Sequence, residues 1–163
     1  MTTYTLPYFG EIDLKSLDEY YEVKIAIQGK TIKIDINFEE ETISKKDIDI
    51  TKSILERLDD FYKVAQTAII NDFGKGGEVD EYIEYIEEYI SDEELAPYLK
   101  EVDKNLDKKN QILSIIYLKR VGLYPDDDNN VVLDFTISSD LLHYVLVINM
   151  NAKCEIENMC MES

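Results

Sequence analysis

A strict two-residue alternation between Tyr20 and Phe38 constrains the fold more than any other feature of the chain. Apolar side chains occupy every second position, and mostly polar residues stand between them. The apolar positions are Tyr21, Val23, Ile25, Ile27, Ile32, Ile34, Ile36 and Phe38. Two such runs joined by Gln28-Gly29-Lys30 predict an antiparallel hairpin with one face in solvent. An earlier strand is predicted around Tyr4 to Leu14, where Pro7 favours an edge position or a bend.

The pattern then changes to the period of a helix. Between Ile50 and Phe73 the apolar residues recur at steps of three and four, which predicts one long amphipathic helix. Gly74 follows at the position of a C-terminal helix cap. A second helix is predicted from about Glu78 to Ile90, and Ser91 with Glu94 has the capping-box spacing of a third, short helix.

Beyond residue 109 the pattern is again that of strands. Ile112 to Val121 and Leu141 to Met150 are apolar on both faces, which predicts two central strands. Val131 to Ile137 alternates and should have one exposed face. A last strand is predicted near Lys153 to Glu157.

Strands, then helices, then strands predict an α+β domain. We expect an antiparallel sheet of about six to seven strands, with roughly two or three helices inserted between the N-terminal and C-terminal strands and packed on one face. One domain should span residues 1–163. Its N-terminal strands are expected in 1–40, its helical segment in 44–105 and its C-terminal strands in 110–160.

The charge balance restricts the partners that the chain can bind. Its 35 acidic and 17 basic residues give a formal net charge of −18. Nucleic acids and anionic membranes are unfavourable partners, because proteins bind phosphates through lysine and arginine, whereas a basic protein is a favourable partner. A negative surface can also serve only to keep a protein soluble and monomeric. Without a basic leader or a run of about 18 apolar residues, the sequence predicts a cytoplasmic protein.

The predicted helix from Glu78 to Ile90 contains the run DEYIEYIEEYI and concentrates the negative charge. Residues 78–103 hold eleven acids and a single basic residue, Lys100. On a helix the isoleucines form a core stripe, the tyrosines lie together on one flank, and the acids cover the remaining side. The candidate partner-binding residues are Glu81, Tyr82, Glu84, Tyr85, Glu88, Tyr89 and Asp92. The alternative is a solvated face whose tyrosines half cover the core.

One segment partly matches a calcium-binding loop. Asp126, Asp128 and Asn130 stand at the first, third and fifth ligand positions of such a loop. Val131 and Ile137 replace the glycine and the bidentate glutamate that the loop requires. The segment is therefore predicted to be a polar turn between two strands.

The remaining candidates for chemistry lack essential parts of their motifs. Gly74-Lys75-Gly76-Gly77 follows a helix and has no Ser or Thr after the lysine, so it indicates a helix break rather than a phosphate loop. His143 is the only histidine, and we predict that it lies in a strand. Cys154 and Cys160 lack metal-binding spacing and are expected to be reduced thiols. We assign no catalytic, cofactor-binding or metal-binding residue.

Segments at both ends of the chain suggest a family. The segment Tyr8-Phe9-Gly10-Glu11-Ile12, the strand pair from Tyr144 to Ile156 and the final Glu162-Ser163 together resemble a family of small bacterial proteins of unknown function. Such proteins, and related acidic α+β proteins, look like the immunity proteins of bacterial polymorphic toxin systems. The resemblance implies a protein without enzymatic activity that binds and occludes a basic toxin domain, and it supplies no catalytic residues.

Three functional hypotheses follow. The first is a non-enzymatic acidic binding module of the immunity type, which needs no cofactor and exists as a monomer or a weak homodimer. The second is a self-associating structural or accessory protein in which the tyrosines and an exposed strand edge pair two copies. The third is a carboxylate- or metal-dependent hydrolase, since among 35 acids some pair will lie at a catalytic distance.

Overall fold

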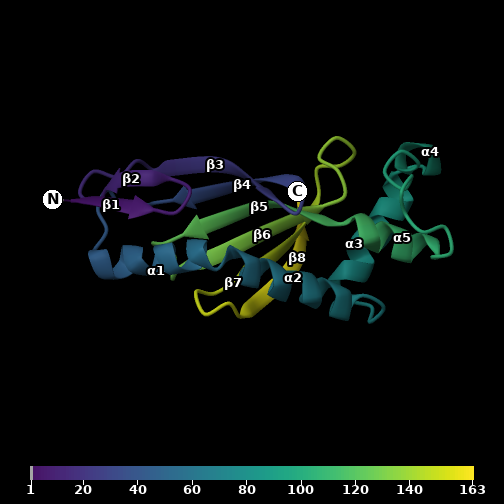
Figure 1. Ribbon diagram of the computed structural model, residues 1–163. Helices are drawn as coiled ribbons and strands as arrows, with labels where there is room; N and C mark the ends of the chain where they lie inside the picture. The colour runs from purple at the N-terminus through teal and green to yellow at the C-terminus, as the bar shows by residue number, and fades with distance from the viewer. Residues whose placement is uncertain (1) are drawn as a thin grey trace.

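The computed structural model describes residues 2–163, and within this range the chain forms a large six-stranded sheet, a separate two-stranded sheet and five helices (Figure 1). In spatial order the large sheet contains β3 (Tyr20–Ile27), β4 (Lys30–Asn37), β5 (Tyr117–Tyr124), β6 (Asn130–Thr136), β7 (Val145–Met150) and β8 (Ile156–Glu162). The predicted α+β class is confirmed. The sheet is mixed rather than antiparallel, however, because β4 and β5 are parallel.

The hairpin predicted between Tyr20 and Phe38 is confirmed. β3 and β4 pair antiparallel without a break in register, and the loop between them is two residues long. Its residues Gln28 and Gly29 have φ angles of 49° and 78°. Positive φ at both central positions matches the right-handed twist of the two strands, so the turn closes a tight hairpin.

The single N-terminal strand that was predicted is instead a small hairpin of its own. Its strands are β1 (Thr3–Leu6) and β2 (Gly10–Asp13), which pair only with each other. The chain turns at Pro7, whose ring cannot donate a ladder hydrogen bond, and at Tyr8, which has a φ of 69°. The strand signal was therefore correct, and the bend that Pro7 favoured is a turn that divides the segment into two paired strands.

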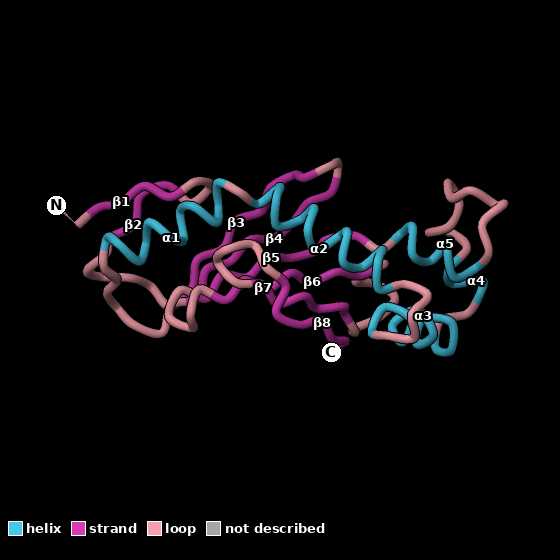
Figure 2. Tube along the Cα trace, turned by 90° about the horizontal axis from the view of Figure 1, so that it is seen from below, coloured by secondary structure: helices cyan, strands magenta, loops and turns pink. Residues whose placement is uncertain are grey.

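The first two helices explain why β4 and β5 are parallel. α1 (Lys45–Glu56) and α2 (Leu58–Asp72) run in succession along one face of the large sheet (Figures 1 and 2). They carry the chain back toward the end of the sheet where β4 began, so β5 enters beside β4 and runs in the same direction. A crossover of this kind joins parallel strands, whereas the sequence pattern shows only the order of the elements.

The long helix predicted from Ile50 to Phe73 is two helices. Ser44 caps α1 by accepting a hydrogen bond from the backbone N–H of Asp47, so the first helix starts before Ile50, although within the helical segment predicted in 44–105. Arg57 interrupts it with φ −117° and ψ 23°, and its N–H bonds to the oxygen of Ile54, three residues back. Apolar spacing continues across the interruption, which is why the pattern did not reveal it.

The other three helices lie beyond one end of the large sheet rather than on its face (Figures 1 and 2). They are α3 (Glu78–Tyr89), α4 (Asp92–Leu95) and α5 (Lys108–Ile115). Ser91 and Glu94 form the predicted capping box of α4. The central strand predicted from Ile112 to Val121 is wrong in its first half. That half belongs to α5, and only the part from Tyr117 onward is extended, as β5.

The C-terminal strands are present, but two of them start later than predicted. β6 agrees with the prediction, whereas β7 begins at Val145 and β8 at Ile156. His143 therefore lies in the loop before β7 and is exposed, so the prediction of a strand histidine is wrong. The segment from Asp126 to Asn129 is the predicted polar turn, and it joins β5 to β6.

The core lies between the large sheet and the helices. Ile34, Ile36 and Leu133 project from the sheet and are completely buried. Tyr62 of α2 stacks on Phe135 of β6 with 6.4 Å between ring centroids, which places α2 directly over the sheet. The opposite face of the sheet carries mainly polar side chains. Among the described helices, none is both long and apolar enough to cross a membrane.

Candidate protein-binding surface

Helix α3 is fixed in place by its apolar stripe and by the loop that precedes it. Val79, Ile83 and Ile86 are completely buried, as the helical spacing predicts. The carboxylate of Asp80 accepts hydrogen bonds from the backbone N–H groups of Gly74 and Gly76, at 2.8 and 2.6 Å. These bonds hold the pKa of Asp80 below its usual value. Asp80 is therefore occupied in shaping the turn between α2 and α3.

Tyr82 is the one candidate residue that lies in the core. Its side chain is completely buried, and its hydroxyl donates to the backbone oxygen of Tyr144 at 3.0 Å. Burial raises the pKa of Tyr82 to about 12. The helical angle placed Tyr82 next to the core stripe but could not show that the chain before β7 covers it. Tyr82 thus packs in the core beneath the candidate surface and is not accessible to a partner.

The other two tyrosines of α3 form an aromatic row with a third that the sequence did not indicate. The ring of Tyr85 lies 4.6 Å from that of Tyr89 and 4.7 Å from that of Tyr144, between centroids. Tyr89 is 61 % exposed, and the other two are half-buried. We call Tyr144, Tyr85 and Tyr89 the tyrosine ladder. Tyr144 was missed because its place beside α3 depends on the path of the loop, for which the sequence holds no periodic signal.

Three candidate glutamates border this ladder and remain open to solvent. Glu81, Glu84 and Glu88 are exposed, and within residues 2–163 none of them has an ion-pair partner. Glu81 and Glu88 stand four residues before and three residues after Tyr85, so they flank its ring on the helix surface. Glu84 stands three residues after Glu81 and four residues before Glu88, and like charges at spacings of three and four residues repel and cost helix stability. We call Glu81, Glu84 and Glu88 the acidic row.

Asp92, the last candidate, is already paired within the chain. Lys108 of α5 lies 2.6 Å from its carboxylate, and Lys109 lies 2.5 Å from Glu87. The hydrogen bond with Glu87 outweighs burial and raises the pKa of Lys109, with further contributions from Glu84 and Asp80. The two lysines stand just outside the strongly acidic segment 78–103, and the helix α5 brings them back against it. The negative surface is consequently narrower than the sequence suggested.

His143 and the two cysteines are the remaining candidates for chemistry. No three histidine, cysteine, aspartate or glutamate side chains of residues 2–163 are arranged to hold a metal ion. Cys154 and Cys160 are free thiols, and burial is the main cause that raises the pKa of each. A raised pKa keeps a thiol protonated and makes it a poor nucleophile.

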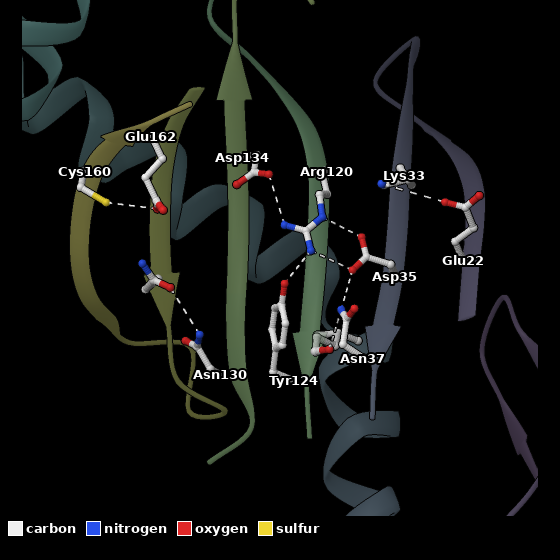
Figure 3. Close-up of polar contacts among 12 residues, drawn as sticks. Glu22, Lys33, Asp35, Asn37, Arg120, Tyr124, Asn130, Asp134, Cys160 and Glu162 are labelled. Carbon is white, nitrogen blue, oxygen red and sulfur yellow. Dashed lines mark hydrogen bonds and ion pairs between the residues drawn. The ribbon is translucent and has the colours of Figure 1, made fainter. Parts of the chain in front are cut away.

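The polar face of the sheet contains a cluster that the sequence analysis missed (Figure 3). Arg120 of β5 donates through Nε and Nη2 to the carboxylate of Asp35 in β4, at 2.7 and 2.8 Å. It also donates to Asp134 at 3.2 Å and to the hydroxyl of Tyr124 at 2.8 Å. Asp35 is completely buried and Arg120 is 20 % exposed. These bonds join β4, β5 and β6, and a hollow of about 340 Å³ lies over Arg120, Tyr124 and Asp134 on the polar face.

Three comparisons bear on the identity of the chain. No protein-family model, no curated protein and no solved structure matches it. The resemblance to immunity proteins therefore stays a prediction from the two ends of the sequence.

Proposed function

We propose that this chain is a non-enzymatic protein-binding module that uses α3 to bind a basic protein. The observation that supports it is the juxtaposition of the tyrosine ladder with the unpaired acidic row. Acids that served only solubility would not need to be concentrated beside a row of aromatic rings at a cost in helix stability.

The two parts of the surface suit the two parts of a lysine or arginine side chain. The tyrosine rings offer flat apolar area with little conformational entropy to lose, and their faces attract cations. Carboxylates next to the rings can accept hydrogen bonds from the same cation, and bind a guanidinium in a forked geometry. Tyr85 and Tyr89 already contact each other ring against ring at a tilt of 36°, so a partner meets a preorganised surface.

The kind of partner that fits is a protein with a cationic cleft. A toxin domain that acts on nucleic acid needs a basic surface to hold phosphates, and an acidic row can occupy that surface in place of the substrate. This immunity-type role accords with the resemblance of the two chain ends to immunity proteins. Association of this kind should be fast and should weaken steeply with salt, because surface charges steer the encounter.

Charge reversal with a matched control tests the proposal. The test variant carries Glu81→Lys, Glu84→Lys and Glu88→Lys, and the control carries Glu39→Lys, Glu40→Lys and Glu41→Lys at exposed positions far from α3 in the sequence. Each Glu→Lys change adds two charges, so both variants move the formal net charge from −18 to −12. Wild type and both variants are each used at low salt to retain basic proteins from the source cells. The retained protein is then purified, and its affinity for wild type and for each variant is measured by titration.

We expect wild type and control to bind one basic protein with similar affinity and the test variant to lose roughly a hundred-fold or more, as expected for a charged hot spot. Tyr89→Ala should weaken binding without any change of charge. If both triple variants lose affinity equally, only the overall charge matters and α3 is not the interface. If wild type retains no basic protein, the proposed function is wrong.

A further inference from the structure

β3 forms one edge of the large sheet and leaves one side of its backbone without a partner. It pairs with β4 alone, over eight residues and without a bulge. The N–H of Phe38 bonds to the oxygen of Glu19 at 2.9 Å, which fixes the alternation of the ladder. Odd-numbered residues of β3 therefore bond to β4, and even-numbered residues direct their N–H and C=O groups outward. The outward residues are Tyr20, Glu22, Lys24 and Ala26, all of them exposed.

The other edge of the sheet is better protected. β8 has an irregular register against β7 near Met150, and α3 lies close to it. Its charged residues, Glu157 and Glu162, are all acidic, so two copies of β8 would repel. β3 has neither proline nor bulge to block pairing, and its two outward charges have opposite signs. An edge strand of this length and regularity is a ready template for another strand.

We propose that β3 pairs antiparallel with β3 of a second copy of this chain, about a twofold axis at Val23. In this register Glu22 lies opposite Lys24 of the second copy, and the symmetry repeats the contact. Tyr20 lies opposite Ala26 of the second copy. All outward residues then form hydrogen-bonded pairs, and the charges at the centre are complementary.

Neighbouring registers fail on the same rules. A twofold axis at Glu22 places this carboxylate opposite its own copy, and an axis at Lys24 does the same with two ammonium groups. Like charges directly opposite one another destabilise a strand pair. A shift by one residue would place the free backbone N–H and C=O groups of one copy opposite residues of the other copy that already bond to β4, so no ladder would form. The alternation of charge in β3 thus favours the register about Val23 over its two neighbours about Glu22 and Lys24.

The helix-facing side of β3 also favours a second strand. Val23, Ile25 and Ile27 are only half-buried there because the sheet ends. A hollow of about 460 Å³ lies beside the last two, lined also by Tyr8 and Leu58 and by the carboxylates of Glu56 and Asp59. In the proposed register Val23 meets Val23 of the second copy, and Ile25 meets its Tyr21. Apolar surface on both copies is thereby removed from water.

The pairing should be weak at low salt, because each copy carries a formal net charge of −18. Salt screens this long-range repulsion more than it weakens backbone hydrogen bonds and apolar contacts. The dimer should therefore strengthen as salt rises to about 0.5 M, whereas binding of a basic partner should weaken. It uses none of the residues of the tyrosine ladder or the acidic row, so either proposal can fail without the other.

A charge swap at Glu22 and Lys24 tests both the interface and its register, with sedimentation velocity as the measurement. Glu22→Lys and Lys24→Glu each place like charges opposite one another twice, and each should weaken self-association roughly ten- to hundred-fold. The double variant, and an equimolar mixture of the two single variants, should both recover wild-type association. Ala26→Pro should also weaken it, because it removes an outward N–H that β4 does not use.

Amide hydrogen exchange provides a readout that a change of stability alone does not move. The N–H groups of Glu22 and Lys24 should gain protection as the protein concentration of the wild type increases. The proposal is overturned if wild type stays monomeric up to about 1 mM at high salt, or if the double variant and the mixture remain monomeric. It is equally overturned if Tyr89→Ala, and not the charge swap, controls a dimer.

Discussion

Arg120 donates two hydrogen bonds to Asp35 across the parallel pair β4–β5, although the two residues are 85 positions apart in the sequence. The carboxylate of Asp35 is completely buried on the sheet face that the alternating pattern assigned to solvent. The guanidinium covers it and turns an exposed position into an interior one. The only parallel junction of the large sheet, among the residues described, is thus held by an ion pair as well as by its ladder.

Removing the guanidinium should be costly. Arg120→Met leaves the carboxylate of Asp35 in a site shaped for a cation, and breaking a buried pair in this way costs about 3–5 kcal/mol. Lys33→Met is the matched control, because Lys33 lies beside Arg120 in the sheet register but is 38 % exposed and 4.0 Å from Glu22. Its loss should cost less than about 1 kcal/mol. Urea unfolding followed by circular dichroism measures both, and equal losses would contradict the assigned role of Arg120.

Gly122 provides the space in which the guanidinium lies. A Cβ at this position would stand 2.4 Å from Nη2 and 2.8 Å from Cζ of Arg120. Gly122→Ala should therefore push the guanidinium away from Asp35 and cost about 1–3 kcal/mol. In the Arg120→Met background the methyl group meets a flexible apolar chain, and the additional loss should be smaller. A double-mutant cycle of unfolding free energies measures the difference, and strict additivity would count against the clash.

The two carboxylates that share Arg120 should respond in opposite ways to neutralisation. Burial raises the pKa of Asp134 despite the attraction of Arg120, so the folded state holds its proton to a higher pH than the unfolded chain does. Between the two pKa values the folded state binds more protons, and the stability contributed by Asp134 falls as pH rises through that window. Asp134→Asn removes this loss and should leave the unfolding free energy at pH 7 unchanged or higher.

Asp35→Asn makes the matched comparison. It removes the charge that the Arg120 fork binds at two points, and should cost about 3 kcal/mol at pH 7. Chemical unfolding at pH 7 distinguishes the two residues. A similar loss in both variants would mean that Asp134 is as necessary to the cluster as Asp35.

The sequence was informative where one periodicity dominated. The hairpin of β3 and β4, the core stripe of α3 and the capping box at Ser91 each follow from local spacing and side-chain chemistry. α5 was mistaken for a strand because Ile112, Leu113 and Ile116 are apolar on every side, and a short apolar run has no period to distinguish the two structures. The N-cap at Asp107, which accepts a hydrogen bond from the N–H of Asn110, was the local signal that could have corrected this.

The remaining differences concern contacts between distant segments. A helical angle shows that Tyr82 adjoins the core stripe, but its burial is decided by a carbonyl 62 residues later in the chain. In the same way, α5 supplies the lysines that neutralise Glu87 and Asp92. The sequence therefore predicted which kinds of residue form the candidate surface and which helix carries them. The extent of this surface depended on tertiary contacts that no local pattern encodes.

Tyr82 should make the protein sensitive to alkaline pH. Its pKa is about 12 in the folded state, mainly because it is buried, against an ordinary value of 10.0. Between these values the folded state retains the proton that the unfolded chain has lost. Its contribution is therefore present below pH 10 and is lost as pH rises toward 12, by up to about 3 kcal/mol.

Tyr82→Phe separates this effect from the general loss of stability in alkali. At pH 7 the variant should lose about 1–2 kcal/mol, because the backbone oxygen of Tyr144 loses its donor. Between pH 10 and 12 its stability should fall less steeply than that of wild type, so the two curves converge. Tyr89→Phe, which changes a ring that is 61 % exposed, should keep the wild-type slope. Urea unfolding at a series of pH values measures all three, and a Tyr82→Phe curve parallel to wild type would show that the buried hydroxyl does not govern alkaline stability.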